Sequence, residues 1–277
     1  MPEDFKAGFL KTLWIIRDYL SEIVIGGGWV PLIYYHYLLA DKSREPIRTR
    51  DIDLMVKLKL PVIGSKTVDQ LLVEAGFRSN FKSRETPPVI CYEGNIDGHE
   101  VEIEFLTDQR GAKEDVVIEV QKGLSAQSLR FISIPLTNVI EVEIDDIPVV
   151  DGSSPLKVKI PSPGAYIFHK GLVFARRGRQ QKKAKDLYYI FDILANCFQL
   201  REQIIKELIE LKKVYPHTWF RRFIRNLEDY FSNLTSEGVM LVLVQRPAGA
   251  FPDLNDEQFK QYVLGTFEKF IQEIKSF

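Results

Sequence analysis

A run of three glycines between two apolar segments constrains this fold more than any other feature. Residues 23–25 are apolar and β-branched, which predicts a short buried strand. Gly26–Gly28 follow at once and remove every Cβ at the point where the next helix should begin. Because glycine allows positive φ and close approach of other groups, the segment predicts a tight corner with an accessible backbone.

The segment after the glycines is apolar and helical in pattern. The run from Trp29 to Ala40 predicts a mostly buried helix, and Pro31 is tolerated in its first turn, where backbone N–H groups have no helical partner. These N–H groups and the helix dipole favour a negatively charged group. The corner therefore predicts an anion site suited to phosphate.

Two aspartates alternate in the next predicted strand. Residues 51–56, DIDLMV, place Asp51 and Asp53 on one face, while Ile52 and Leu54 point into the core. Two carboxylates side by side repel each other unless a cation lies between them. Magnesium is the natural candidate, because it prefers hard oxygen ligands and phosphates can complete its shell.

These elements in this order resemble a known signature. Gly27-Gly28-Trp29, a helix, and then Arg48-Thr49-Arg50-Asp51-Ile52-Asp53 resemble the polymerase-β nucleotidyltransferase superfamily. The resemblance implies a nucleoside triphosphate (NTP) substrate and two Mg²⁺ ions. It also implies that Gly27 and Gly28 hold the triphosphate, and that Arg48 or Arg50 neutralises phosphate charge in the transition state.

The same resemblance implies a third carboxylate on a later strand, directly before an apolar run. Glu104, followed by Phe105 and Leu106, fits that position best, and Glu102 is the alternative. Many relatives carry aspartate at this position. From the residues alone, a solvated glutamate face on an antiparallel strand is the other interpretation.

Length and composition are those of an ordinary globular protein. The chain has 277 residues, 45% of them hydrophobic, and a net charge of −1, so we expect two domains and no global attraction to nucleic acid or membrane. Cys91 and Cys197 predict neither a disulfide framework nor a zinc site. The first twenty residues predict an amphipathic helix rather than a signal peptide or membrane span, so we expect a cytoplasmic protein.

The remaining pattern predicts a β-rich first half and a helical second half. A helix is expected over 4–20 and another over 67–75, ended by Gly76, and Asp97-Gly98 predicts a hairpin between 89–94 and 99–106. Further strands are expected at 116–120, 131–134, 139–144 and 147–150, and helices at 163–177, 182–196, 199–213, 217–232, 236–246 and 255–274. We therefore expect an α+β fold, with a nucleotidyltransferase mixed sheet in a domain over 1–155 and a helical C-terminal domain over 156–277.

The second half carries a basic run between two predicted helices. Its cations are Arg176, Arg177, Arg179, Lys182, Lys183 and Lys185. Such a run can hold a nucleic-acid backbone through its phosphates, which makes RNA a candidate acceptor. The run lacks an aromatic partner, so base readout is not supported, and a plain exposed loop is the other interpretation.

Lys170 and the segment Lys185-Asp186-Leu187-Tyr188 resemble the subgroup that includes the AbiEii toxins. The resemblance implies that Lys170 reaches triphosphate oxygens and that Asp186 orients the attacking hydroxyl or accepts its proton. It also makes a cognate antitoxin a candidate partner. The family often has a second aspartate where this chain has Tyr189. From the residues alone, Lys170 also fits a solvated helix face and Asp186 fits a first turn that it stabilises.

The function expected from these residues is magnesium-dependent transfer of a nucleoside monophosphate from an NTP to an acceptor hydroxyl, on tRNA or another RNA. Asp51, Asp53 and Glu104 are the expected metal ligands. Two alternatives remain open. In the first, the chain is an inactive binding or regulatory module that keeps the fold, which Glu104 and Tyr189 motivate. In the second, it is an antibiotic-type nucleotidyltransferase that modifies a small molecule.

Overall fold

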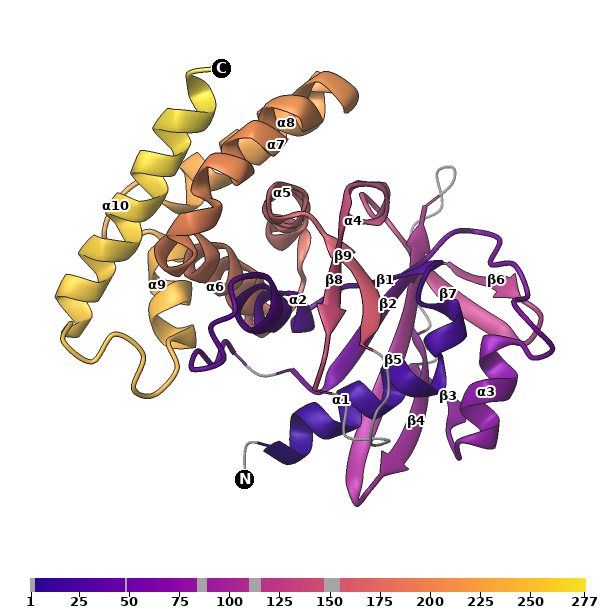
Figure 1. The fold of residues 1–277 in the computed structure, drawn as a ribbon. Coiled ribbons are helices and arrows are strands. Elements are labelled where there is room, and N and C mark those ends of the chain that lie inside the picture. Colours follow the sequence, from indigo (N-terminus) through magenta and orange to yellow (C-terminus); the bar gives the residue numbers. More distant parts are fainter. Residues whose placement is uncertain (1–2, 48, 84–88, 110–115, 147–154) are drawn as a thin grey trace. The chain divides into compact units, whose positions relative to one another are not determined.

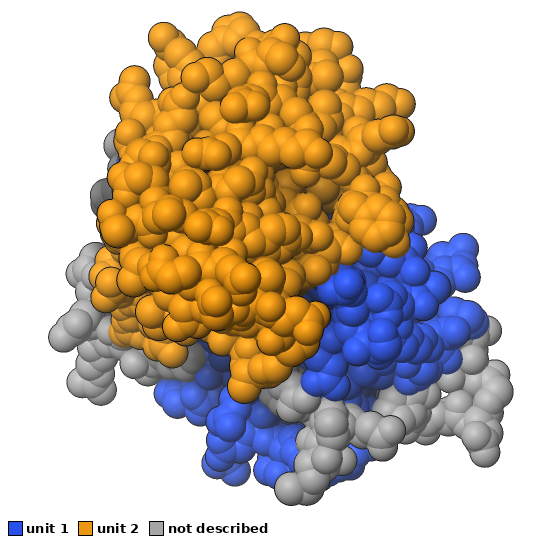
Figure 2. All heavy atoms as spheres, turned by 90° about the vertical axis from the view of Figure 1, so that its left-hand side faces the viewer, with its two compact units in different colours: residues 1–161 blue, residues 162–277 orange. Residues whose placement is uncertain are grey.

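The chain divides into two compact units, residues 1–161 and 162–277 (Figure 2). The computed structural model describes residues 3–47, 49–83, 89–109, 116–146 and 155–277. The fold class is confirmed: unit 1 has a mixed sheet with helices, and unit 2 is helical (Figure 1). The division falls after strand β9 (Leu156–Pro161), six residues beyond the boundary predicted from the sequence, and the assignment of separate roles to the two parts stays a prediction.

Unit 1 is built on one mixed sheet, which contains nine strands within the described residues. Its main path has the order β3-β4-β5-β2-β1-β9-β8, and β7 joins both β5 and β6 beside that path. The other strands are β1 (Ile23–Ile25), β2 (Asp51–Val56), β3 (Arg78–Ser83), β4 (Val89–Ile96), β5 (His99–Asp108), β6 (Val117–Gln121), β7 (Leu124–Leu129) and β8 (Val139–Ile144).

The central pairs of this sheet mix directions. Strand β2 runs antiparallel to β1 and parallel to β5. Strand β5 is paired antiparallel with β4 over its first residues and parallel with β7 over its last. Strand β9 is parallel to β1 and antiparallel to β8. The long β5 therefore joins both parts of the sheet.

One face of the sheet is covered by α1 (Glu3–Ile15) and α3 (Val68–Glu74) (Figure 1). A Cβ added to Gly8 in α1 would lie 3.1 Å from Val101 Cγ2, and Tyr92 in β4 donates a hydrogen bond to Asp69 Oδ1 at 2.7 Å. The side chains beneath these helices are buried, among them Ile52, Leu54, Ile103 and Phe105. This core leaves the opposite face of the central strands for polar side chains.

Several local predictions are confirmed. Thr67 caps α3 in a reciprocal arrangement with Gln70, and Gly76 has a φ of +90° just after the helix. The hairpin turn consists of Asp97 (φ +53°) and Gly98 (φ +87°), as expected for a two-residue loop with positive φ at both positions. The predicted helix over 4–20 becomes α1 followed by a 3-10 turn, Arg17–Tyr19.

The strand predicted over 131–134 is wrong. A short helix, α4 (Ser133–Thr137), begins there, because Asp108 Oδ1 accepts a hydrogen bond at 2.8 Å from the Ser133 N–H. Strand β7 was missed because its polar residues interrupt the apolar pattern, although two of them, Gln127 and Ser128, are buried between β5 and β6. Strand β9 was also missed, and the strand predicted over 147–150 lies outside the described residues.

Unit 2 contains the six predicted helices, and all are confirmed. They are α5 (Pro163–Val173), α6 (Gln180–Asn196), α7 (Arg201–Val214), α8 (His217–Tyr230), α9 (Glu237–Gln245) and α10 (Asp256–Lys275), with 3-10 turns at Phe174–Arg176 and Phe198–Leu200. Their core is rich in aromatic side chains, including Phe168, Phe191, Phe223 and Phe270. Among the helices that the structure describes, none is both long and apolar enough to cross a bilayer.

Candidate functional site

The glycine corner touches the second aspartate of β2. The Gly26 N–H donates a hydrogen bond to the Asp53 carbonyl at 2.7 Å, and Gly27 has a φ of +61°. A Cβ added to Gly27 would lie 1.7 Å from Asp53 Oδ2. Both the backbone conformation and the space therefore require glycine at this position.

Trp29 fixes the helix that follows the corner. Helix α2 (Trp29–Ile33) begins after Gly28 and continues as a π-helical turn, Tyr34–Leu38, so the predicted helix is present but changes its winding. Trp29 Nε1 donates to the Asp51 carbonyl at 3.1 Å, and its ring stacks on Phe9 with centroids 4.0 Å apart. This buried aromatic side chain therefore joins the corner to strand β2.

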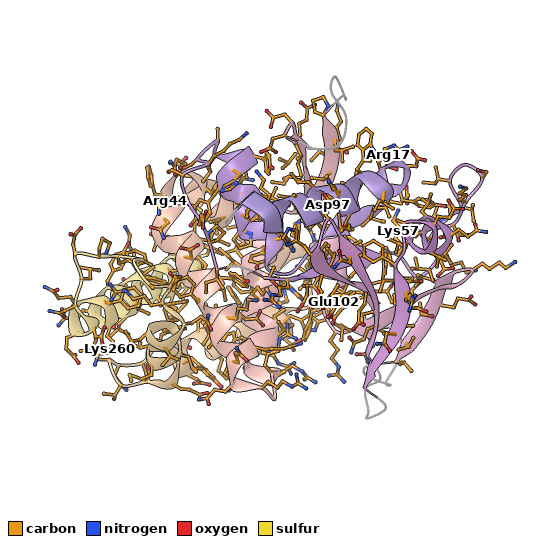
Figure 3. The ribbon with its side chains drawn as sticks, turned by 90° about the horizontal axis from the view of Figure 1, so that it is seen from below. Arg17, Arg44, Lys57, Asp97, Glu102 and Lys260 are labelled. Atoms are coloured by element: carbon orange, nitrogen blue, oxygen red, sulfur yellow. The ribbon has the colours of Figure 1, made fainter. Side chains whose placement is uncertain are left out.

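The register between β2 and β5 brings the predicted acids together. These strands are parallel, with Asp51 opposite Glu102 and Asp53 opposite Glu104. Directly opposed residues point to the same side, and neighbouring strands lie about 4.8 Å apart. Four carboxylates therefore share one face of the sheet, and all four are partly exposed (Figure 3 labels Glu102). We call these residues the acid face.

The same face becomes apolar further along both strands. Met55 follows Asp53, and Leu106 follows Glu104, each two residues on. These side chains pack with Val24 and Ile132 in a buried cluster, which Leu129, Leu136 and Val139 border. This cluster packs directly after the acids in β2 and β5, so the acids are held by packed strands rather than by a loop.

Strand β4 adds residues that sequence reasoning missed. Cys91 lies opposite Glu104, and Glu93 lies opposite Glu102. The ligand atoms of Cys91, Glu93 and Glu102 lie within 4.8 Å of one another. The signal was present in the sequence, because a two-residue turn at Asp97-Gly98 fixes the register of β4 on β5. That turn lies beside α1 (Figure 3 labels Asp97), and Lys11 of α1 pairs with Asp97.

Unit 2 contains the other two predicted residues, and they contact each other. Lys170 Nζ in α5 lies 2.5 Å from Asp186 Oδ1 in α6, and Arg177 Nε lies 2.9 Å from Asp186 Oδ2. Lys170 is 6% exposed and Asp186 is 4% exposed. We call Lys170, Arg177 and Asp186 the buried ion triad.

The triad sets the protonation of Asp186 and of the neighbouring His169. Burial alone would raise the pKa of Asp186, but the charges of Lys170 and Arg177 outweigh it and lower that pKa to about 2. Burial, helped by the same two cations, lowers the pKa of His169 to about 3. Asp186 is therefore a carboxylate, and His169 is a neutral imidazole, at neutral pH.

The basic run predicted over 176–185 is divided by the fold. Arg177 belongs to the triad, and Lys183 Nζ contacts Tyr230 Oη at 2.8 Å and Glu237 Oε1 at 2.9 Å. Arg176, Arg179 and Lys182 are exposed. Arg50, beside the acid face in sequence, is also exposed, whereas Arg48 lies outside the described residues.

Comparison with known proteins supports a family assignment. A family model described as "Nucleotidyltransferase" matches residues 15–210, which is most of the chain. The match covers the glycine corner, both strands of the acid face and the whole buried ion triad. No curated protein and no solved structure matches the chain.

Proposed function

The chain belongs to the nucleotidyltransferase family, and from this premise we propose that it transfers a nucleoside monophosphate from an NTP to an acceptor hydroxyl with the help of magnesium. The observation that carries the proposal is the parallel register of β2 on β5, with the acids of both strands facing one side. The sequence contains neither the Gly-x-Ser-x-Gly elbow of serine hydrolases nor the Gly-x-Gly-x-x-Gly motif of dinucleotide-binding proteins.

The acid face fits a divalent metal. Its donors are carboxylate oxygens, which are the ligands that Mg²⁺ prefers. We propose that Asp51, Asp53 and Glu104 hold two Mg²⁺ ions, with Glu102 as the alternative third ligand. When bound, the ions lower the pKa of the attacking hydroxyl and neutralise charge that develops on the leaving pyrophosphate.

The chain's own residues position the substrate. In this proposal the missing side chains of Gly27 and Gly28 let the triphosphate approach the backbone next to Asp53. An added Cβ at Gly27 would lie 1.7 Å from Asp53 Oδ2, so this glycine lies directly against the second aspartate. Arg50 directly precedes Asp51, and in this proposal it neutralises phosphate charge in the transition state. Arg48 keeps the same role as a prediction only.

For the buried ion triad we propose a positioning role. An Asp186 with a pKa of about 2 is a weak base, and its two oxygens already accept bonds from Lys170 and Arg177. This supports Asp186 as the residue that orients both cations, with Lys170 or Arg177 facing phosphate. Proton acceptance by Asp186 remains the less supported part of the prediction.

The proposal also includes an acceptor and a biological role. RNA is the acceptor we favour, and a toxin role with a cognate antitoxin follows only from the resemblance to the AbiEii group. A small-molecule acceptor and an inactive binding module are the competing functions. No contact of the described residues favours either of them.

The test is Asp51→Asn, assayed with labelled NTPs, Mg²⁺, cellular RNA and candidate acceptors. Transfer should fall at least ~10³-fold, which is about 4 kcal/mol of transition-state stabilisation. The matched control is Glu143→Gln, which removes an exposed carboxylate of β8 paired with Lys157 and should transfer normally. Wild-type transfer by the Asp51 variant counts against the assignment.

A second comparison chooses the third ligand. Glu104→Gln should reduce transfer more than Glu102→Gln does, because Glu104 lies opposite the aspartate that touches the glycine corner. The reverse order would move the role to Glu102. If the wild-type chain binds neither Mg²⁺ nor any NTP, the inactive-module alternative replaces the proposal.

A further inference from the structure

Helix α8 carries exposed arginines on its outer face. Arg221, Arg222 and Arg225 are all exposed. At 3.6 residues per turn they fall within an arc of about 100°. The opposite side of the helix is apolar and buried, with Phe220, Phe223 and Leu227. We call the three residues the arginine face.

The packing of α8 on α5 holds this face outward. A Cβ added to Gly171 in α5 would lie 2.4 Å from the Phe223 ring, so the two helices cross at close range. Asn226 Nδ2 also donates to the Gly171 carbonyl at 2.8 Å. Because both contacts are specific, α8 cannot rotate to bury its arginines without losing them.

The arginine face differs from those exposed cations of unit 2 that are paired with acids. Lys213 pairs with Glu210 at 2.7 Å, and Lys275 pairs with Glu228 of α8 itself at 2.7 Å. None of the three arginines forms an ion pair with any residue in the described part of the chain. Asp229 is the one acid exposed on α8, one turn beyond Arg225, and leaves the face with a net charge of +2.

An aromatic pair borders the arginine face at the start of the helix. Tyr215 and Trp219 stack with ring centroids 5.7 Å apart and planes inclined by 15°. Both are partly exposed. Trp219 precedes Arg222 by three residues, so the two side chains are neighbours on the helix surface. Cations beside aromatic rings are the combination by which proteins hold single-stranded nucleic acids.

We propose that the arginine face and the Tyr215–Trp219 pair form a binding surface for single-stranded RNA. The guanidinium groups contact backbone phosphates, which they match in geometry and charge. A base stacks at the aromatic pair. The exposed side chains of this face are polar, whereas a protein-binding surface needs an apolar centre, and this favours RNA over an acidic protein.

The inference rests on the proposed function in one respect, because it gives RNA the role of acceptor. It moves the main RNA contact away from the basic run over 176–185, where Arg177 and Lys183 are held by acids of unit 2. Binding itself needs neither NTP nor metal. It can therefore be measured separately from transfer.

The experiment is fluorescence anisotropy with a short labelled single-stranded RNA, titrated with full-length protein at several salt concentrations. The variant R221Q/R222Q/R225Q should bind at least about tenfold more weakly. Each lost phosphate contact removes ~0.7 from the slope of log K against log salt, so the slope should fall by about 2. Trp219→Leu should weaken binding without changing that slope.

The matched control is K206Q/K213Q/K269Q, which removes three exposed cations from α7 and α10 of the same unit. It should change neither affinity nor slope appreciably, and circular dichroism should show both triple variants folded. An arginine variant that binds RNA as the wild type does overturns the proposal. So does an equal loss in the control, or a loss confined to R179Q/K182Q, which would return the contact to the basic run.

The two proposals fail separately. If the arginine variant binds normally while Asp51→Asn still abolishes transfer, only the RNA surface is lost. If the wild-type chain binds RNA through α8 but transfers no nucleotide, only the proposed reaction is lost. Tight binding of an acidic protein by a chain that ignores RNA would also overturn the surface assigned here.

Discussion

Asp53 in unit 1 and Asp186 in unit 2 are carboxylates in opposite electrostatic surroundings. Across the strands, Asp53 faces Glu104, and further carboxylates share its side of the sheet. Asp186 is instead bonded to Lys170 and Arg177. Carboxylates gathered together repel one another until a cation is added, whereas the buried triad carries its own counter-charges. The acid face is thus suited to binding a cation, whereas the triad joins α5 to α6 and holds its own two cations in position.

The largest expected effect comes from breaking the triad with Lys170→Met. A buried carboxylate that loses one of its cations should cost ~3–5 kcal/mol in the free energy of unfolding. Urea denaturation measures this. Lys170→Met/Asp186→Leu should recover most of the loss, because it leaves no unpaired buried carboxylate and because Arg177, whose side chain is 33% exposed, keeps contact with water.

The control for this prediction is Lys213→Met, which breaks an exposed pair with Glu210 and should change stability by less than ~0.5 kcal/mol. If Lys170→Met is as mild as this control, the triad does not hold the helices. The triad would then contribute no more to stability than an exposed ion pair does.

Adding one methyl group at Gly27, beside the acid face, should give the next largest effect, a loss of nucleotide transfer. Gly27→Ala places a Cβ at 1.7 Å from Asp53 Oδ2, so the carboxylate must move. Nucleotide transfer should fall ~10²-fold, or about 2.7 kcal/mol. Magnesium affinity, measured by calorimetry, should fall with it.

Gly64→Ala is the matched control, because Gly64 has a φ of +71° but no atom within 4 Å of an added Cβ. It should lose ~1 kcal/mol of stability from backbone strain and keep its activity. Equal activity losses in the two variants would mean that strain, and not the contact with Asp53, explains the Gly27 result.

The smallest expected effect is a pH dependence of stability at the triad. The pKa of Asp186 is about 2 when folded and near 3.8 when unfolded, so its contribution is complete above about pH 5. It should be lost as pH falls through 4 towards 2, by ~1 kcal/mol at pH 3 and ~2 kcal/mol near pH 2. The difference in unfolding free energy between wild type and Asp186→Asn should therefore shrink on acidification; a constant difference contradicts the coupling.

Local signals were sufficient for the parts of the site that lie close together in sequence. The glycine corner, the Asp-x-Asp strand and the Asp97-Gly98 turn each depend on a few neighbouring residues, and each is present as predicted. The helices of unit 2 were equally readable, because their apolar residues recur with the helical period.

Long-range contacts decide what could not be predicted. The pairing of β2 with β5 joins segments that lie far apart in the chain, and only the resemblance to a family suggested Glu104. Strand β7 contains several polar residues, and its burial depends on pairing with two neighbouring strands. The sequence of β7 alone therefore did not predict it. Whether a cation is paired also depends on the fold: Arg177 is bound by Asp186, while the arginines of α8 are exposed.

The β2–β5 register also protects the protein during folding. A slip of β2 by one residue against β5 would turn Asp51 and Asp53 towards the helices α1 and α3, and would move Ile52 from the core to the acid face. Burying ionised carboxylates without partners costs far more free energy than the hydrogen bonds of a misaligned strand could contribute. The acidic residues proposed for catalysis therefore also specify the strand register, because they make a misaligned pairing of β2 less stable than the correct one.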